Sequence, residues 1–319
     1  MSLRTLLIAC AALLASSLSC AAGFPSQRIT IVVPFPAGGP NDLLARMAAE
    51  KMAAELKQPV VVENRPGAGG NIGVAAVAHA PADGYTILCT IDTPLTVNPS
   101  LFSHLGFDPA KDLTPLSLAV RFSQMLTVNP HLKADNIQQL IALAKTRPLN
   151  YATGGVGSPG QLSGAYFAKV TGTRLDAIPY KGNAPAINAL IGGQVDVGFL
   201  ATAGVLPQVR DGRLKALGVS SAKRSALAPE VPTFAESGLP GFDVSFAMLF
   251  MAPAQTPLDV RNELGTAIGH ALAAGDVRKK LLAMDLDPVA GSPAEASAYL
   301  TEYSERWSKL VHELGLKAD

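Results

Sequence analysis

The stretch Ile31-Val32-Val33-Pro34-Phe35-Pro36-Ala37-Gly38-Gly39-Pro40-Asn41-Asp42 runs from an apolar segment through a proline- and glycine-rich turn into a helical pattern. It predicts a buried strand, a tight turn and the start of a helix. The amides of a first helical turn lack intrahelical partners, and the helix dipole adds partial positive charge there. Gly38 and Gly39 permit close approach of a bound group. The turn is therefore a candidate carboxylate-binding loop, and the alternative is an ordinary connection between a strand and a helix.

The alternation of strand and helix continues beyond this stretch. Strand-like runs alternate with helical patterns, in the order 29–33, 42–56, 60–62, 72–78 and 85–88. This rhythm predicts βαβ units and a largely parallel sheet, which is the α/β class. The mature length of about 297 residues favours two lobes. Because no long linker separates the halves, we expect strands at 120–126 and 243–251 to cross between the lobes.

Capping patterns predict three helix starts later in the chain. Each has an Asp, Thr or Ser followed three residues later by an amide or an acid: Asp135 with Gln138, Thr256 with Asp259, and Ser292 with Glu295. The last of these helices carries a stripe of apolar side chains at helical spacing: Tyr299, Tyr303, Trp307, Leu310 and Leu314. We interpret this stripe as core packing rather than as an aromatic binding surface.

Residues 1–22 have the pattern of a secretory signal peptide. Arg4 precedes an apolar run from Leu6 to Leu18, and small residues follow it. The run is shorter than the roughly 20 residues that a membrane-spanning helix needs. Cleavage near Ala22 is expected, and lipid attachment at Cys20 is the alternative. The sequence thus predicts an exported protein without stable membrane insertion.

The mature chain is formally neutral. Removal of the signal peptide takes away Arg4 and leaves 25 basic residues to match 25 acidic ones. Such a chain has no basic field to attract nucleic acid or an anionic membrane, so an anion has to be held by local geometry. Cys89 is the single cysteine that remains, which excludes an internal disulfide. The hydrophobic fraction of 48% argues against intrinsic disorder.

A second glycine-rich turn, at 64–73, also precedes a predicted helix. It can border the same cleft, but close helix packing accounts for its glycines equally well. Arg65 in this turn is expected to form an ion pair rather than to hold a ligand. In the next loop, the hydroxyl groups of Thr90 and Thr93 are candidate ligand contacts.

A third turn, at 149–161, contains a dinucleotide-binding pattern. The pattern G-x-G-x-x-G is matched by Gly155, Gly157 and Gly160, and Asp176 follows about twenty residues later. The position in the middle of the chain, Pro159 at the expected helix start, and the export signal argue against a nicotinamide cofactor. The same turn can instead offer the Ser158 hydroxyl and glycine amides to an anion.

Two charged residues near later loops are expected to have structural or solvent roles. Lys181, in the loop 178–185 that opens a predicted helix, is expected to be a solvated charge. Asp196, which ends the segment Gly192-Gly193-Gln194-Val195-Asp196, is expected to accept structural hydrogen bonds rather than contact a ligand.

The chain lacks the sequence patterns of common catalytic sites. Its five histidines are scattered without the H-E-x-x-H spacing, at positions His79, His104, His131, His270 and His312. This argues against a zinc or iron site. Neither a G-x-S-x-G elbow nor a G-x-x-x-x-G-K-[ST] loop is present. We therefore expect no catalytic residues, no bound metal and no cofactor.

Eight segments together resemble one family, the Bug-type (TctC-like) extracytoplasmic solute receptors of tripartite tricarboxylate transporters. They follow one another along the chain, at 29–39, 61–70, 82–86, 98–99, 157–160, 180–182, 192–196 and 231–233. The resemblance implies a type II periplasmic-binding-protein fold, in which two α/β lobes close on a ligand in a central cleft. With the expected crossing strands, lobe 1 comprises 23–123 plus 247–319, and lobe 2 comprises 124–246.

In that family the loop that matches Phe35 to Gly39 holds a ligand carboxylate, partly through water, and loops after later strands line the rest. The residues expected to bind the ligand are Phe35, Ala37, Gly38, Gly39, Thr90, Asp92, Thr93, Gly155, Gly157, Ser158, Gly182, Asn183 and Thr202. This chain departs from many relatives at Phe199-Leu200-Ala201, where they carry a polar residue. Either Thr202 supplies that contact, or the pocket prefers a ligand with an apolar or aromatic part.

The resemblance implies a periplasmic receptor that captures a small organic carboxylate and delivers it to membrane permease subunits. Two other functions stay open. One is a sensory receptor that presents its ligand to a membrane kinase, and the other is a nicotinamide-dependent oxidoreductase that uses Gly155 to Gly160.

Overall fold

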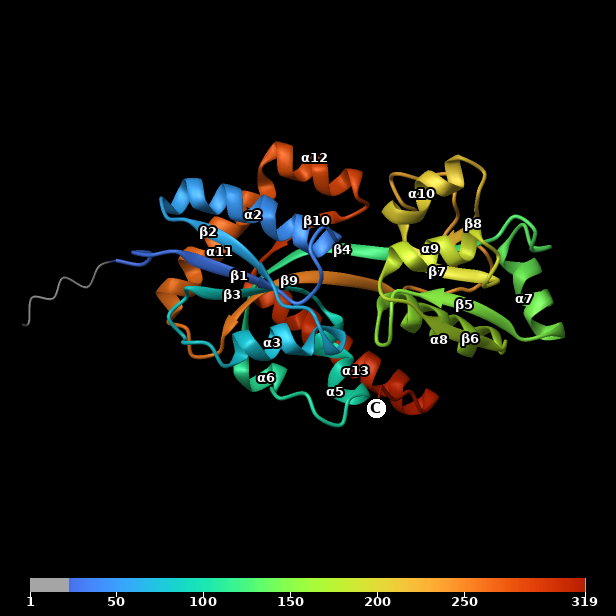
Figure 1. Ribbon diagram of the computed structural model, residues 1–319, viewed down its shortest axis with the longest axis horizontal. Coiled ribbons are helices and arrows are strands. Elements are labelled where there is room, and N and C mark those ends of the chain that lie inside the picture. The colour runs from blue at the N-terminus through green and yellow to red at the C-terminus, as the bar shows by residue number, and fades with distance from the viewer. Residues whose placement is uncertain (1–22, 319) are drawn as a thin grey trace, which may run out of the picture.

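The computed structural model describes residues 23–318, which form two α/β lobes side by side, joined by two long strands (Figure 1). Lobe 1 lies on the left of Figure 1 and lobe 2 on the right. The predicted signal peptide at 1–22, which includes Cys20, lies outside the described residues.

The helices and strands alternate along much of the chain, as the sequence predicts. In lobe 1 they are β1 (Ile29–Val33), α2 (Pro40–Leu56), β2 (Val60–Asn64), the 3-10 helix η1 (Ala68–Gly70), α3 (Asn71–Ala78), β3 (Thr86–Ile91), α4 (Thr93–Thr96), α5 (Asn98–Leu101), α6 (Pro109–Asp112), α11 (Leu258–Ala273), α12 (Gly275–Ala283), β10 (Asp287–Gly291) and α13 (Pro293–Leu314). In lobe 2 they are α7 (Ile137–Thr146), β5 (Leu149–Thr153), α8 (Pro159–Thr171), β6 (Leu175–Pro179), α9 (Asn183–Ile191), β7 (Val197–Ala201), α10 (Thr202–Arg210) and β8 (Lys215–Val219). The two joining strands are β4 (Leu113–Val128) and β9 (Ser245–Pro253).

The two lobes repeat one strand order. In lobe 1, β2, β1 and β3 are parallel, and they are followed by antiparallel β9 and then β4. In lobe 2, β6, β5 and β7 are parallel, and they are followed by antiparallel β4 and then β8. Each lobe therefore completes its sheet with a strand that arrives from the other lobe.

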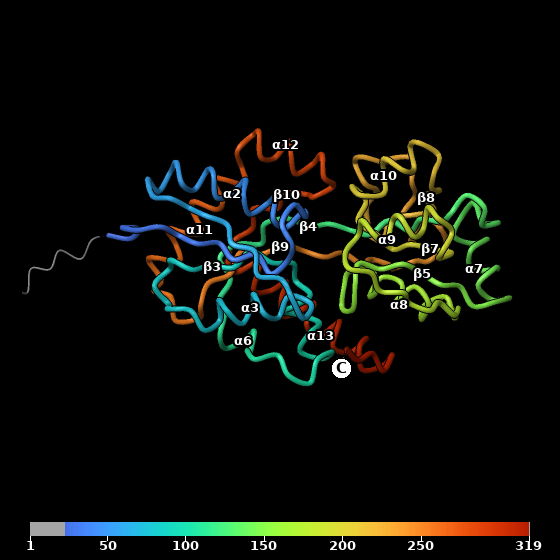
Figure 2. The backbone as a smooth tube through the Cα atoms, viewed as in Figure 1, coloured from blue at the N-terminus to red at the C-terminus, as the bar shows by residue number. Residues whose placement is uncertain are grey.

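The strands β4 and β9 form the crossing between the lobes (Figure 2). The residues of β4 up to Ser123 pair with β9, and from Gln124 onward they pair with β7. The change of partner marks the place where β4 leaves one sheet for the other. The predicted strands at 120–126 and 243–251 thus overlap the observed crossing strands. The exact division into 23–123 plus 247–319 and 124–246 stays a prediction.

The aromatic stripe of α13 is core, as predicted. Tyr299, Tyr303 and Trp307 are buried, and the Trp307 ring stacks on Phe246 of β9 with 5.5 Å between ring centroids. Burying a side chain of this size stabilises the fold by roughly 2–3 kcal/mol. The apolar cluster around these rings continues into lobe 2, where it includes Phe199. The two lobes therefore share one core across the crossing.

Helix α13 also contacts the outer surface of lobe 2. Lys169 of α8 forms an ion pair with Glu313 near the end of α13. The guanidinium group of Arg306 lies 5.8 Å from the centre of the Tyr166 ring, which belongs to α8. The C-terminal helix thus spans the gap between the lobes.

Two of the three predicted helix caps are wrong, and the third is confirmed. Asn136, not Asp135, caps α7: its side chain accepts from the Gln139 amide at 2.9 Å, and Asp135 pairs with Lys215 at 2.5 Å. Thr256 does not cap α11, because its hydroxyl donates to the carbonyl oxygen of Pro253 at 2.8 Å. Ser292 forms the expected capping box at the start of α13.

Candidate ligand-binding site

The parallel strands of both lobes end at the crossing. In lobe 1, Ile91 at the carboxyl end of β3 lies opposite Met248, close to the start of β9. In lobe 2, Ala201 at the carboxyl end of β7 lies opposite Gln124. Open α/β sheets bind ligands outside the carboxyl ends of their strands. The loops that follow β1, β3, β5, β6 and β7 thus form the candidate site between the lobes.

The loop between β1 and α2 exposes Ala37 and Gly38 to solvent. Gly38 has a φ of 84°, in the left-handed region that favours glycine. Its amide donates to a carboxylate oxygen of Asp42 at 2.9 Å, so this predicted donor already has an acceptor. Helix α2 begins at Pro40, which has no amide hydrogen. The donors that remain for an anion are therefore Gly39 and the later amides of the first helical turn.

The buried carboxylate of Asp42 fixes the shape of this loop. It accepts from Arg46 Nε at 2.9 Å and from Asn64 Nδ2 at 2.9 Å. Burial acts to raise the pKa of Asp42, but the hydrogen bonds from Arg46, Gly38 and Asn64 outweigh burial and hold this pKa below its ordinary value. Asn64 also donates to the carbonyl oxygen of Phe35 at 3.0 Å. The charge of Asp42 is thus compensated by Arg46 within the protein.

Gly70 brings three loops of lobe 1 together. It has a φ of 99°, and a Cβ atom here would lie 2.9 Å from Pro94 and 3.2 Å from the Phe35 ring. Glycine therefore lets the loops after β1, β2 and β3 meet closely. In the same turn Arg65 pairs with Glu63 at 2.7 Å, which confirms its predicted role as an ion-pair residue.

The predicted residues after β3 are all buried: Thr90, Asp92 and Thr93. The Thr90 hydroxyl donates to the carbonyl oxygen of Ile91 at 2.9 Å. Asp92 is 0% exposed, and its Oδ2 accepts from the hydroxyl of Tyr299 in α13. Burial raises the pKa of Asp92 to about 7, against the lowering effect of the Tyr299 hydrogen bond and nearby backbone amides. Asp92 is thus a carboxyl group near its point of half-protonation at neutral pH.

The loop between β5 and α8 has a hydrogen bond that matches one in the first loop. Gly157, with a φ of 71°, donates its amide to Gln161 Oε1 at 2.7 Å, as Gly38 does to Asp42. Ser158 caps α8, because its Oγ accepts from the Gln161 amide at 3.4 Å. The hydroxyl hydrogen of Ser158 can still be donated to a ligand.

The loop between β6 and α9 lies against the β5–α8 loop. The Gly182 amide donates to the carbonyl oxygen of Gly154 at 3.1 Å, and a Cβ atom on Gly154 would lie 3.4 Å from Asn183 Oδ1. Gly155, Gly182 and Asn183 are partly exposed. Lys181 is exposed, as the sequence predicts. The structure thus brings the predicted residues of these two loops together.

Residues at the two ends of β7 have different roles. Asp196, just before β7, pairs with Arg147 at 2.8 Å and accepts from the Asn150 amide, which confirms its structural role. Thr202, just after β7, is 2% exposed, and its hydroxyl has no hydrogen-bond partner within residues 23–318. Leu200 is fully buried in the lobe 2 core. Phe199-Leu200-Ala201 stands where many relatives carry a polar residue, but Leu200 exposes no surface to the site.

Asn98 and Gln124 border the site but are not among the predicted residues. A Cβ atom on Gly157 of lobe 2 would lie 3.1 Å from Asn98 Oδ1 of lobe 1, so the lobes meet here. Gln124 is buried in β4 at the crossing, and its Oε1 would lie 3.7 Å from a Cβ atom on Gly160. Asn98 belongs to a segment of the family resemblance, which is a signal that could identify it. Gln124 carries no such signal.

Helix packing and strand geometry account for the dinucleotide-like pattern. A Cβ atom on Gly160 would lie 2.1 Å from the carbonyl oxygen of Phe199, so this glycine lets α8 pack on β7. Asp176 is the second residue of β6, at the amino end of that strand, and it pairs with Arg174 at 3.6 Å. The carboxyl end of β6 is about 10 Å further along the strand. Asp176 is therefore far from the turn that would hold the cofactor.

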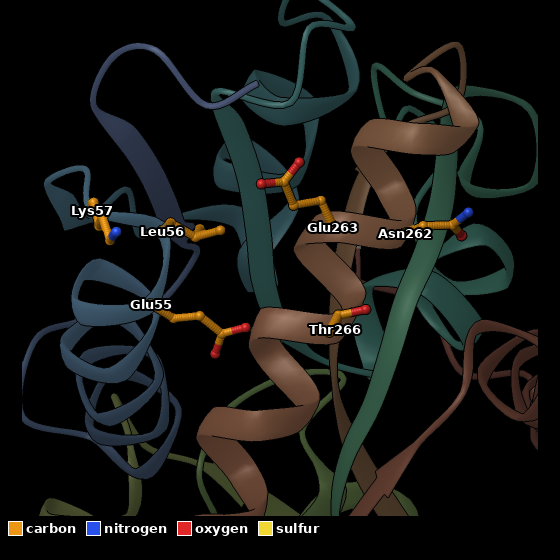
Figure 3. A pocket seen from close by; sticks show the side chains of 6 residues that line it. All are labelled: Glu55, Leu56, Lys57, Asn262, Glu263 and Thr266. Atoms are coloured by element: carbon orange, nitrogen blue, oxygen red, sulfur yellow. The ribbon is translucent and has the colours of Figure 1, made fainter. Parts of the chain in front are cut away.

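Two cavities are lined by residues other than the predicted site residues. One, of about 550 Å³, lies between the end of α2 and α11 and is lined by Glu55, Leu56, Lys57, Asn262, Glu263 and Thr266 (Figure 3). Since α2 is about 25 Å long, this cavity is far from the loop at its start. The other, of about 390 Å³, lies beside the crossing and is lined in part by Arg121, Ser225 and Asp285.

Neither a metal centre nor a membrane span is found in the described part of the chain. Residues 23–318 contain no group of His, Cys, Asp and Glu side chains that could hold a metal ion. Among the same residues, no helix combines the length and the apolar character that crossing a membrane requires.

The repeated strand order, the two crossing strands and the loops that meet between the lobes define a two-lobed solute-binding protein with the type II periplasmic-binding-protein fold. The chain belongs to the tripartite tricarboxylate transporter receptor family. The model of that family, described as "Tripartite tricarboxylate transporter family receptor", matches residues 44–316. This confirms the resemblance seen in the sequence, and members of this family are solute-binding receptors.

Individual relatives agree with this assignment. The chain is 38% identical to protein BugT of Bordetella pertussis over 92% of this chain and 91% of BugT. A protein of R. palustris solved with adipate is 33% identical, with a TM-score of 0.85 over 92% of this chain and 99% of that one. MatC of Rhodopseudomonas palustris, solved with bound malate, is 32% identical, with a TM-score of 0.81 over 90% of this chain and all of MatC.

Proposed function

We propose that this chain captures a small organic carboxylate between its lobes and delivers it to the permease subunits of a tripartite transporter. The observation that carries the proposal is the pair of glycine-rich turns at the starts of α2 and α8, both at strand ends that face the crossing. In each turn a helix side chain binds one glycine amide, and at the start of α2 this leaves the Gly39 amide and the next amides of the helix for an anion. At the start of α8 the groups that remain are the Gly160 amide and the Ser158 hydroxyl, because the Ser158 and Gln161 amides already have acceptors. The structures of relatives with adipate and malate support a carboxylate ligand.

The proposed contacts come from both lobes. In lobe 1 they are Phe35, Ala37, Gly38, Gly39, Thr90, Asp92 and Thr93, and in lobe 2 they are Gly155, Gly157, Ser158, Gly182, Asn183 and Thr202. Closure moves lobe 2, at 124–246, against lobe 1, at 23–123 plus 247–319, and excludes water from the ligand. The chain has neither a catalytic role nor a cofactor in this proposal.

The proposed location is the periplasm. The signal-peptide pattern of residues 1–22 and the membership of a receptor family both support export. Mass spectrometry of the protein from a membrane-free periplasmic extract should find an amino terminus near Gly23. A lipid-modified Cys20 in the membrane fraction would contradict a free, soluble receptor.

The change Gly39→Val tests the carboxylate loop. Gly39 has a φ of −77°, and its Cβ atom would meet the Pro36 carbonyl oxygen at an ordinary distance of 3.7 Å, so valine fits the backbone. Its methyl groups would stand beside the first amides of α2. We expect the affinity for adipate or malate, measured by calorimetry, to fall at least about tenfold, since a blocked charge-assisted hydrogen bond is worth roughly 1.5–3 kcal/mol.

The matched control is Gly275→Val at the exposed start of α12. This glycine also begins a helix, but the adjacent Asp276 pairs with Lys51 in the second half of α2, well away from the loop at the start of that helix. The control should bind the same acid as tightly as the unmodified protein. Unchanged affinity of Gly39→Val would refute the assignment of this loop.

Delivery to a permease is tested in cells. Deleting the chain should abolish uptake of the acid that calorimetry identifies, and re-expression of the unmodified chain should restore it. Uptake that continues unchanged would exclude the transport role.

A further inference from the structure

Asp92 is a buried carboxyl group without a cation beside it. It is 0% exposed at the carboxyl end of β3, the end that faces the crossing. In the described chain, no Lys, Arg or His forms an ion pair with it. A buried charge that lacks a counter-ion is costly, and such a group tends to bind a proton instead.

The two oxygens of Asp92 differ in their contacts. Oδ2 accepts from the Tyr299 hydroxyl, whereas Oδ1 is buried and has no hydrogen-bond partner among residues 23–318. Leaving a buried polar atom without a partner carries a free-energy penalty, so such atoms are rare in folded proteins. A ligand atom at Oδ1 would remove the penalty.

The groups around Asp92 leave it without charge compensation. Tyr299 stacks on Tyr303 with ring centroids 4.1 Å apart, and both belong to α13. Arg121 of β4 lies over the Tyr299 ring, 5.3 Å from its centre. From β9, the carbonyl oxygen of Ala247 accepts from the Asp92 amide, and the backbone amides of Ala247 and Thr93 act on the carboxyl group and lower its pKa. Among residues 23–318, Arg121 thus contacts the ring of Tyr299 and forms no ion pair with the carboxyl group of Asp92.

Lobe 2 has a matching feature. Thr202 follows β7, the strand that corresponds to β3 in the repeated strand order, and its buried hydroxyl also lacks a partner within the described part of the chain. Both third strands therefore end in a buried polar group with an unused hydrogen-bonding atom.

We propose that Asp92 binds a ligand carboxylate as a neutral carboxylic acid, so that ligand binding takes up one proton. This inference rests on the proposed function. When a ligand carboxylate approaches, two ionised carboxylates would share one buried site, which electrostatic repulsion disfavours. A proton from solvent binds Asp92, its O–H donates to the ligand oxygen, and the other oxygen keeps the hydrogen bond from Tyr299. The complex then carries the charge of the ionised receptor, the charge of the ligand and the one positive charge of the added proton.

Calorimetry measures the proton directly. Adipate and malate are titrated into the protein at pH 8 in phosphate and in Tris, which differ in ionisation enthalpy. We expect uptake of close to one proton for each ligand bound, and a dissociation constant that rises up to about tenfold for each pH unit between 7.5 and 9.

The variant Asp92→Asn separates this mechanism from a structural role. Its amide can donate to the ligand and accept from Tyr299, so it reproduces the neutral acid. It should bind the same acid with no net proton uptake and with an affinity that is independent of pH. The control Asp196→Asn, which removes an ion-paired surface carboxylate, should keep the proton uptake of the unmodified protein.

Several outcomes would overturn the proposal. Binding without proton uptake would contradict this inference alone and would indicate that an ionised Asp92 accepts from a ligand hydroxyl or ammonium group. Loss of binding at every pH by a folded Asp92→Asn variant would also contradict this inference and would also indicate that an ionised Asp92 is needed. If neither acid binds the unmodified protein, the proposed dicarboxylate function fails, and the proton uptake fails with it.

Discussion

The raised pKa of Asp92 predicts a pH-dependent stability that the variant Asp92→Asn should lack. In the unfolded chain this carboxyl titrates near 3.8, and in the folded protein near 7. The folded state thus binds the proton more tightly than the unfolded state does. The free energy of unfolding therefore decreases as the pH rises from about 4 to about 7. With about 1.4 kcal/mol for each pKa unit, the full decrease is on the order of 4 kcal/mol.

The measurement is urea-induced unfolding of both proteins at pH 5, 6, 7 and 8, followed by tryptophan fluorescence. At pH 5 the variant should be more stable by only about 1–2 kcal/mol, because the folded carboxyl is still neutral, as asparagine is, and ionisation of the unfolded chain has produced only part of the decrease. At pH 8 the variant should be more stable by a few kcal/mol, with an unchanged dependence of unfolding free energy on urea. Parallel pH profiles for the two proteins would refute the argument that Asp92 is buried without charge compensation.

Two further substitutions test contacts between elements. Gly160→Ala would place a Cβ atom 2.1 Å from the carbonyl oxygen of Phe199, so α8 must shift. The free energy of unfolding in urea should therefore fall by roughly 1–3 kcal/mol. An unchanged free energy of unfolding would contradict this packing. Lys169→Ala removes an exposed ion pair with Glu313, and thermal unfolding should show a loss below about 1 kcal/mol. A larger loss would mean that this ion pair stabilises the fold more than an exposed ion pair ordinarily does.

The sequence predicts the elements of lobe 1 well because their signals are local. The β-branched run at 29–33 is β1, and the proline- and glycine-rich turn after it leads directly into α2. The carboxyl ends of the parallel strands, and the loops that follow them, lie between the lobes, because parallel strands of one sheet end at the same edge. That rule of topology is enough to group the predicted loops into one site.

Features that depend on side-chain competition or on distant contacts could not be predicted in this way. The Gly38 amide is taken by Asp42, and a turn pattern does not show which side chain reaches it. Asp135 and Asn136 are both good caps, and their residue types do not show that the Asn136 side chain accepts from the Gln139 amide while Asp135 pairs with Lys215. Asp92 is buried in part by Tyr299, which lies 207 residues further along the chain.

The position of β9 in lobe 1 has a consequence for the order in which the chain can assemble. The strand partners of β4 are β7, β8, β9 and β10, which all follow it in the sequence. Strand β9 (Ser245–Pro253) pairs with both β3 and the lobe 1 part of β4. Until β9 has been synthesised, both of those strands therefore have a sheet edge without its partner. Exposed edges of this kind invite pairing with other chains. The lobe whose synthesis begins first is therefore the last to be completed, and a fragment that stops before β9 should aggregate even though it contains every strand of lobe 2.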